Sequence, residues 1–251
     1  MKHTSKRLIV FSGLLAACIS VQGTVLDLTT GGASGFVGTA FFEQVNPQST
    51  GTGILDPFLR LQANGTEHGY NTSAGPQPPF DAKGGVFTHD LLFGDLTRVI
   101  KDGTEYFEFL LDLNEINNDR EKYISLESVQ IWTGSTAAPS TESLATIGTI
   151  RYDMDNLFLG GASSSRIDLD ASLNHGSGGG DMFAYIPTSL FAGVAATDNV
   201  YFYSAFSESD AGFEEWALIE RLNPVPEPTT LAGGILLGAL AAGHMVRRSR
   251  K

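Results

Sequence analysis

Carboxylate and amide side chains crowd into short polar stretches of this chain, and such oxygen-rich stretches can bind calcium. The densest is LDLNEINNDRE, which contains Asp112, Asn114, Asn117 and Asp119. Calcium takes hard oxygen ligands of this kind. The stretch lacks the central glycine and the final glutamate of an EF-hand loop, so a calcium site and a solvated turn both stay open. The sequence fixes no cofactor, and calcium is the one candidate.

A second chemistry is the recognition of sugars by aromatic rings. Trp132 and Trp216 lie in apolar, strand-like segments, ISLESVQIW and EEWALIE. On the face of a sheet such rings can stack on sugars, with nearby acidic and amide groups binding the hydroxyls. Aromatic residues in strands also pack in cores, so core packing is the alternative interpretation.

Enzyme chemistry has weaker support. A glycoside hydrolase needs two well-placed carboxylates, and the chain offers pairs such as Glu214 and Glu215. Adjacent residues of a strand point to opposite faces, which argues against this pair acting together. The sequence has no H-E-x-x-H, G-x-S-x-G or P-loop motif and no cysteine in its central part. We therefore predict no catalytic residue, with a hydrolase on a β-sandwich as the alternative function.

The charge of the chain excludes one class of partner. The formal net charge is −12, and between Thr24 and Pro224 there are 9 basic and 27 acidic residues. A surface this negative repels phosphate backbones, so we predict no nucleic-acid partner.

The elements that must position these residues are β-strands. In TEYFEFLLDLNE the apolar residues alternate with acidic ones, and NVYFYSAFS alternates in the same way. In ISLESVQIW the alternation slips between Leu126 and Val129, which indicates a bulge, and Asp102-Gly103 indicates a hairpin. Residues 46–85 are predicted to form a long packed loop. We predict an all-β fold for residues 24–222: a single antiparallel β-sandwich, jelly-roll-like.

The first 23 residues are predicted to be a secretory signal peptide. A basic start precedes an apolar run from Leu8 to about Ile19, and Gly23 is the predicted cleavage position for signal peptidase. Leu15-Ala16-Ala17-Cys18 resembles a lipobox, so lipoprotein processing at Cys18 is the alternative. Cys18 is the single cysteine, so a body that begins at Thr24 forms no internal disulfide.

Residues 223–251 are predicted to be a sorting segment with three parts. A proline-rich hinge at 223–228 precedes an apolar stretch at 229–246, just long enough to be a single transmembrane helix. A basic tail at 247–251 follows, and the positive-inside rule keeps it cytoplasmic. The tail's charged residues, the predicted cytoplasmic stop, are Arg247, Arg248, Arg250 and Lys251.

The order of these parts resembles the PEP-CTERM sorting signal of Gram-negative bacteria. The residues that carry the resemblance are Val225, Pro226, Glu227 and Pro228, followed by the Gly/Ala/Leu stretch and the arginine-rich end. The resemblance implies recognition and cleavage by an exosortase, a membrane-embedded transpeptidase that accompanies exopolysaccharide production. Strings such as GTGILDPFLRLQANGTEHGYNT resemble the bodies of a recurring group of PEP-CTERM proteins, which implies shared architecture alone.

These observations predict an exported protein. We expect a precursor anchored in the inner membrane and a mature form at the cell surface or in the extracellular matrix. Its expected role is structural or adhesive, with exopolysaccharide as a binding partner. A calcium-stabilised surface protein is a further alternative.

Overall fold

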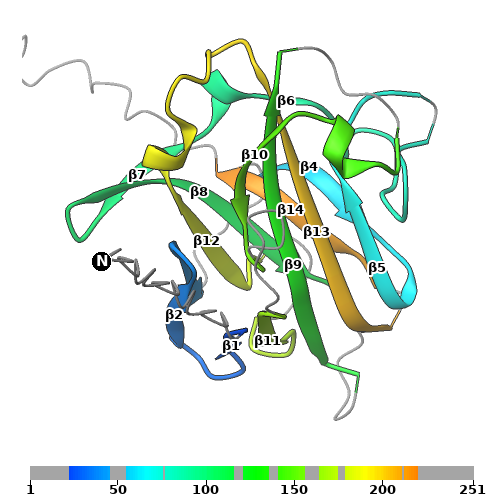
Figure 1. Ribbon diagram of the computed structural model, residues 1–251. Coiled ribbons are helices and arrows are strands. Elements are labelled where there is room, and N and C mark those ends of the chain that lie inside the picture. Colours follow the sequence, from blue (N-terminus) through cyan, green and yellow to red (C-terminus); the bar gives the residue numbers. More distant parts are fainter. Residues whose placement is uncertain are drawn as a thin grey trace, which may run out of the picture.

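Two β-sheets lie face to face in the computed structural model of this chain (Figure 1). The structure describes residues 23–45, 55–75, 77–115, 121–135, 141–155, 164–174, 179–210 and 212–219. In these residues the chain is mostly β and forms two antiparallel-rich sheets, which confirms the predicted all-β sandwich. The predicted signal peptide and the sorting segment at 223–251 lie outside the described residues. No helix in the described part of the chain is long and apolar enough to cross a membrane.

Seven strands form the first sheet, in the order β1-β11-β9-β13-β5, with β10 also paired to β9 and β6 to β13. Their bounds are β1 Val25–Asp27, β5 Asn64–Tyr70, β6 Leu91–Leu92, β9 Tyr123–Gly134, β10 Thr149–Asp153, β11 Arg166–Asp170 and β13 Asn199–Asp210. All the pairs are antiparallel except that of β1 with β11, which is parallel and departs from the predicted all-antiparallel arrangement.

Seven strands also form the second sheet, in the order β2-β3-β12-β8-β14-β4, with β7 also paired to β8. Their bounds are β2 Ser34–Val37, β3 Ala40–Gln44, β4 Leu55–Leu61, β7 Arg98–Lys101, β8 Thr104–Leu113, β12 Met182–Pro187 and β14 Glu214–Ile219. Short 3-10 helices lie in the connections of the described part of the chain: η1 Phe93–Asp95, η2 Leu144–Thr146 and η4 Thr188–Phe191.

Two local predictions from the sequence are confirmed. Asp102 and Gly103 both have positive φ, 50° and 81°, and they join β7 to β8 in a tight hairpin. In β9 the register to β13 passes from Leu126 directly to Ser128, so Glu127 is the extra residue of a bulge. The bulge keeps both Leu126 and Val129 in the core although they are three residues apart.

The prediction of a long loop at 46–85 is wrong, because this region contains β4 and β5. Pro57 lies within β4. β4 lies at the edge of its sheet, with β14 as its neighbouring strand and an isolated bridge between Leu61 and Ala82 on its other side. An edge strand tolerates a proline, which lacks the N–H that a central strand must donate.

Aromatic side chains join the two sheets at the centre of the core. Phe202 of β13 projects from the first sheet onto three rings of the second, with centroid distances of 5.7 Å to Phe58, 5.0 Å to Phe109 and 4.5 Å to Trp216. The Trp216 indole nitrogen also donates a hydrogen bond of 3.0 Å to Ser204 Oγ across the sheets. Strand β13 therefore contacts the opposite sheet through both an apolar side chain, Phe202, and a polar one, Ser204.

This packing predicts that Phe202→Ala destabilises the fold by about 3–5 kcal/mol, because it removes a ring that contacts three others and leaves a cavity. Urea unfolding of the purified protein measures the change in free energy. Ile100→Ala is the control, since Ile100 is exposed and its truncation should change stability by less than about 0.5 kcal/mol. Equal effects of the two substitutions would contradict this description of the core.

Candidate functional site

A groove of about 320 Å³ lies on the outer face of the first sheet. Three neighbouring strands line it, because Asp168 of β11 pairs with Ser125 of β9, and Ser125 pairs in turn with Ser207 of β13. Residues next to Asp168, Ser125 and Ser207 in the sequence face the core. Because successive side chains of a strand point to opposite faces, these three point outward. The complete lining is Thr29, Tyr123, Ile124, Ser125, Glu127, Arg166, Asp168, Leu169, Ser207 and Glu208.

Hydrogen bonds hold the polar side chains of the groove in place. Ser125 Oγ donates to Asp168 Oδ1 over 3.0 Å, and the same oxygen lies 2.9 Å from Arg166 Nε. Ser207 Oγ donates to Glu127 Oε1 over 2.6 Å. The β9 bulge places Glu127 beside Ser207, so an irregularity of the strand contributes directly to the groove. The result is a row of fixed donors and acceptors at the surface.

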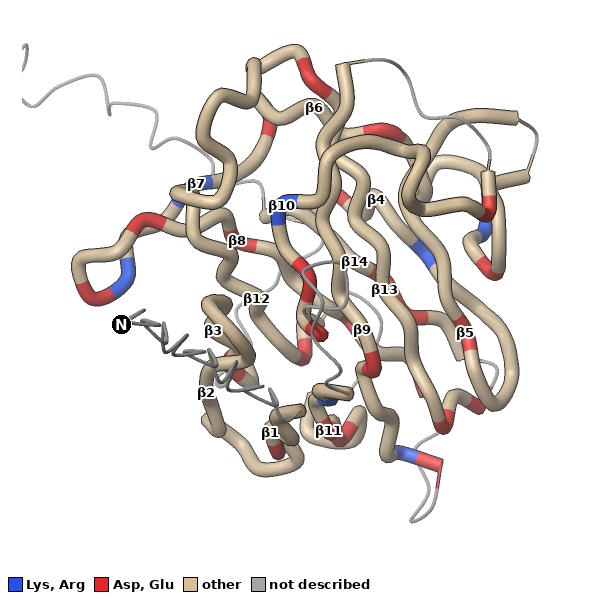
Figure 2. Tube along the Cα trace, in the orientation of Figure 1, with Lys and Arg blue, Asp and Glu red and all other residues tan. Residues whose placement is uncertain are grey.

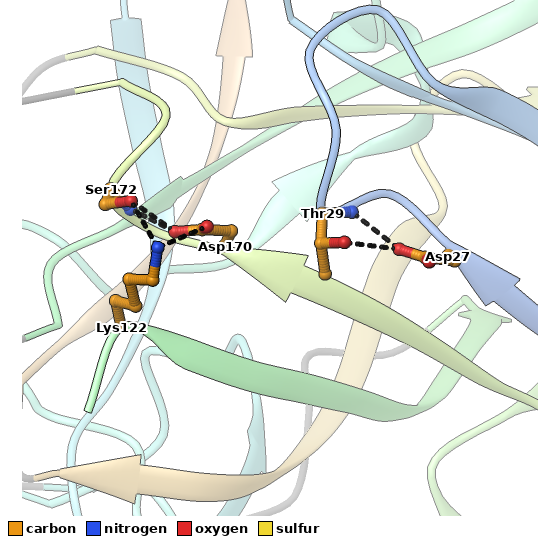
Figure 3. Close-up of polar contacts among 5 residues, drawn as sticks. All are labelled: Asp27, Thr29, Lys122, Asp170 and Ser172. Atoms are coloured by element: carbon orange, nitrogen blue, oxygen red, sulfur yellow. Dashed lines mark hydrogen bonds and ion pairs between the residues drawn. The ribbon is translucent and has the colours of Figure 1, made fainter. Parts of the chain in front are cut away.

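Tyr123 gives the groove an aromatic wall at the start of β9. Its side chain is 42% exposed, and Lys122 Nζ lies 4.8 Å from the centre of its ring. Lys122 in turn lies 3.0 Å from Asp170 Oδ2, and Asp170 accepts hydrogen bonds from Ser172 (Figure 3). The hydrogen bond to Asp170 raises the pKa of Lys122, so this lysine stays charged over the ring. Burial opposes the ionisation of Asp170, but the bonds from Ser172 and Lys122 outweigh it and lower its pKa.

A capped turn forms the rim of the groove next to β1. Asp27 Oδ1 accepts hydrogen bonds from the backbone nitrogen of Thr29, at 2.9 Å, and from its hydroxyl, at 2.6 Å (Figure 3). These bonds lower the pKa of Asp27. The turn therefore holds Thr29 in a fixed position where it lines the groove.

The predicted calcium stretch is only partly within the described residues. Asp112 is buried near the end of β8 and Asn114 follows the strand, whereas Asn117 and Asp119 lie outside the described part of the chain. The charge of Asp112 helps to raise the pKa of Asp181, which precedes β12. No three His, Cys, Asp or Glu side chains within the described ranges are already arranged as a metal site.

Both tryptophans proposed to stack on sugars are buried. Trp216 is 0% exposed and lies between the sheets. Trp132 is 3% exposed, in a second cluster with Tyr70, Ile147 and Tyr201. Neither ring presents a face to solvent in this structure, and the exposed aromatic side chain at a groove is instead Tyr123.

The adjacent carboxylates of β14 point to opposite faces, as strand alternation requires. Glu214 pairs with Leu113 and is fully buried, whereas Glu215 lies 2.6 Å from Arg60 on the other face. The two therefore do not form a catalytic pair. The predicted sorting residues, Val225 to Pro228, and the basic tail Arg247 to Lys251 lie outside the described residues.

No family model matches the chain, and no curated protein or solved structure is significantly similar to it.

Several groove residues were missed from the sequence, namely Tyr123, Glu127, Arg166 and Ser207. The slip in the alternation of ISLESVQIW was the one available signal, because it located the bulge at Glu127. The pairing of three strands from distant parts of the chain carries no comparable local pattern.

Asp181 provides a prediction about pH. Burial raises its pKa to about 8, and the charges of Asp112 and Asp170 add to the rise, while a 2.7 Å bond from the Leu113 nitrogen opposes it. Because the folded state holds this proton more tightly than the unfolded chain, its contribution to stability is present below about pH 4 and is lost as the pH rises to about 8. Asp181→Asn should therefore remove on the order of a few kcal/mol of pH dependence between pH 5 and 8.

Urea unfolding at pH 5, 6, 7 and 8 measures this difference. The control is Asp95→Asn, which changes an exposed aspartate of η1 and should keep the pH dependence of the original protein. Parallel pH profiles for the Asp181→Asn variant and the original protein would show that Asp181 is ionised in the folded state at neutral pH.

Proposed function

We propose that this chain is an exported, non-catalytic protein that binds exopolysaccharide in the groove on the outer face of the first sheet. The observation that carries the proposal is the row of Asp168, Ser125 and Ser207 across three strands, with the exposed ring of Tyr123 beside it. A sheet fixes such groups in advance, so little conformational entropy is lost on binding.

The chemistry of the lining suits a sugar. Carboxylates such as Asp168 and Glu127 accept hydrogen bonds from vicinal hydroxyls, and Arg166 donates to ring and hydroxyl oxygens. The serine hydroxyls already donate to these carboxylates, so their oxygens are left to accept a hydrogen bond from the sugar. Tyr123 offers an apolar face for the C–H groups of a pyranose ring. Binding sites commonly combine an aromatic surface with a few placed polar groups in this way.

Charge narrows the class of polysaccharide. Acidic positions outnumber basic ones along the described trace (Figure 2), and the groove itself contains Glu127, Asp168 and Glu208 against one arginine. A uronic-acid or sulfated polymer would be repelled by this field. We therefore favour a neutral polysaccharide or one that contains amino sugars.

Export is the second half of the proposal. Signal peptidase would remove a signal peptide at 1–23, which directs the chain to the inner membrane. An exosortase would then cut the PEP-CTERM signal at 223–251. The jelly-roll-like body would pass from the inner membrane to the cell surface or matrix. The support is the ordered run of hinge, short apolar stretch and basic end in the sequence. A short, marginally hydrophobic stretch would anchor the precursor in the membrane only until it is cleaved.

The binding half predicts that Tyr123→Ala weakens binding to the producing cells' own exopolysaccharide about 10-fold, which corresponds to about 1.4 kcal/mol. Titration of purified protein with oligosaccharide fragments measures the affinity. Phe36→Ala is the matched control, because Phe36 is also exposed but lies on β2 of the other sheet. Equal affinities for the original protein and the Tyr123→Ala variant would reject the groove as the binding site.

The export half predicts that replacing Pro226, Glu227 and Pro228 with alanines stops processing at the C-terminal end. The precursor should accumulate in the membrane, with its mass larger by the uncut segment. Removal of the N-terminal segment should continue and acts as an internal control for export. A variant with normal mature mass and location would refute sorting through these residues.

A further inference from the structure

Three glutamates from different parts of the chain meet between the two sheets. Glu67 lies in β5, Glu214 begins β14, and Glu115 follows β8 by two residues. Glu67 pairs with Phe206, and Glu214 pairs with Leu113. Since both partners face the core, and cross-strand partners share a face, the two glutamates also point inward. Glu67 is 2% exposed and Glu214 is 0% exposed.

The hydrogen bonding of this carboxylate trio, Glu67, Glu115 and Glu214, is incomplete. One oxygen of Glu67 accepts a 2.7 Å bond from the Ala63 nitrogen, and one of Glu115 accepts a 3.0 Å bond from the Asp210 nitrogen. The second oxygen of each, and both oxygens of Glu214, are buried and accept no hydrogen bond from a donor group. The ion pairs of the described residues include no member of the trio.

Electrostatics makes this arrangement costly unless a positive charge joins it. Burial raises the pKa of Glu214 well above its usual range, and hydrogen bonds with Glu67 and Glu115, together with the charges of these two residues, raise it further. Burial likewise raises the pKa of Glu67. Carboxylates this close cannot all ionise in a low-dielectric interior. Because these oxygens are buried and no ion pair of the described residues involves them, the trio requires bound protons or a bound cation.

We infer that the carboxylate trio binds a divalent cation, calcium, between the two sheets. Calcium prefers carboxylate oxygens, takes six to eight ligands and accepts irregular geometry. The trio supplies up to six oxygens, and four of them are buried with no hydrogen-bond donor from outside the trio. As the side chains stand, no group of three acidic side chains among the described residues is placed to hold a metal ion, so the trio must rearrange to bind one. Each glutamate has three rotatable bonds, and a calcium ion draws such side chains together.

A cation at this position has a structural consequence. Glu67 belongs to β5 of the first sheet, and Glu214 belongs to β14 of the second. Glu115 follows β8, which is also a strand of the second sheet. The ion would cross-link the two layers in a body that has no disulfide. Binding to the folded state alone stabilises that state in proportion to the logarithm of the ion concentration. This inference concerns stability and does not rest on the polysaccharide groove.

The experiment measures the melting temperature of the purified full chain at pH 7.5 with EDTA and with millimolar calcium chloride, at matched ionic strength. The original protein should gain about 5 °C or more with calcium, and much less with magnesium. Glu214→Gln should lose the gain. Glu142→Gln, which removes the same charge from an exposed position, should keep it.

Titration calorimetry should give one calcium ion per chain for the original protein and for Glu142→Gln. Glu115→Gln provides a second test at the end of a strand, and it should weaken calcium binding at least 10-fold while leaving the protein folded. A melting temperature that does not respond to calcium in the original protein would overturn the inference and assign protons to the trio. An undiminished response in Glu214→Gln would overturn it equally, by placing the calcium elsewhere.

Discussion

The packing of Phe202 against three aromatic rings of the opposite sheet is the contact on which the rest of this structure depends. A body with no cysteine has no covalent link between its layers, so the burial of apolar side chains must hold the two sheets together. The hydrogen bond from Trp216 to Ser204 fixes their relative position, because a slip of one residue would leave both polar groups unpaired.

The candidate groove follows from the same strands that build this core. Strand alternation sends Phe206 of β13 inward and Ser207 outward, so each strand that packs the core also presents a polar row to solvent. The groove is therefore as rigid as the core behind it. The carboxylate trio is the exception to this division, since it places charge on the inward face. In the trio the two layers meet through buried carboxylates with no basic partner among the described residues.

Much of the local structure was predictable from the sequence, because alternation, tight turns and bulges are encoded by neighbouring residues. The strands around Phe109 and Phe202, the Asp102-Gly103 hairpin and the opposed faces of Glu214 and Glu215 all follow from such patterns. Contacts between distant segments were not predictable. Alternation places Trp132 on the outer face, but the segment containing Ile147 covers it there. The groove and the carboxylate trio likewise depend on strand order, which no local pattern specifies.

Polysaccharide binding on the outer face of the first sheet is the central proposal for this protein, and a crystal structure with bound oligosaccharide tests it most directly. Crystals of the protein grown with fragments of the producing cells' exopolysaccharide should show a sugar ring against Tyr123, with its hydroxyls bonded to Asp168, Arg166 and Glu127. Density for the sugar over the outer face of the second sheet, or an empty groove at saturating oligosaccharide, would contradict the account.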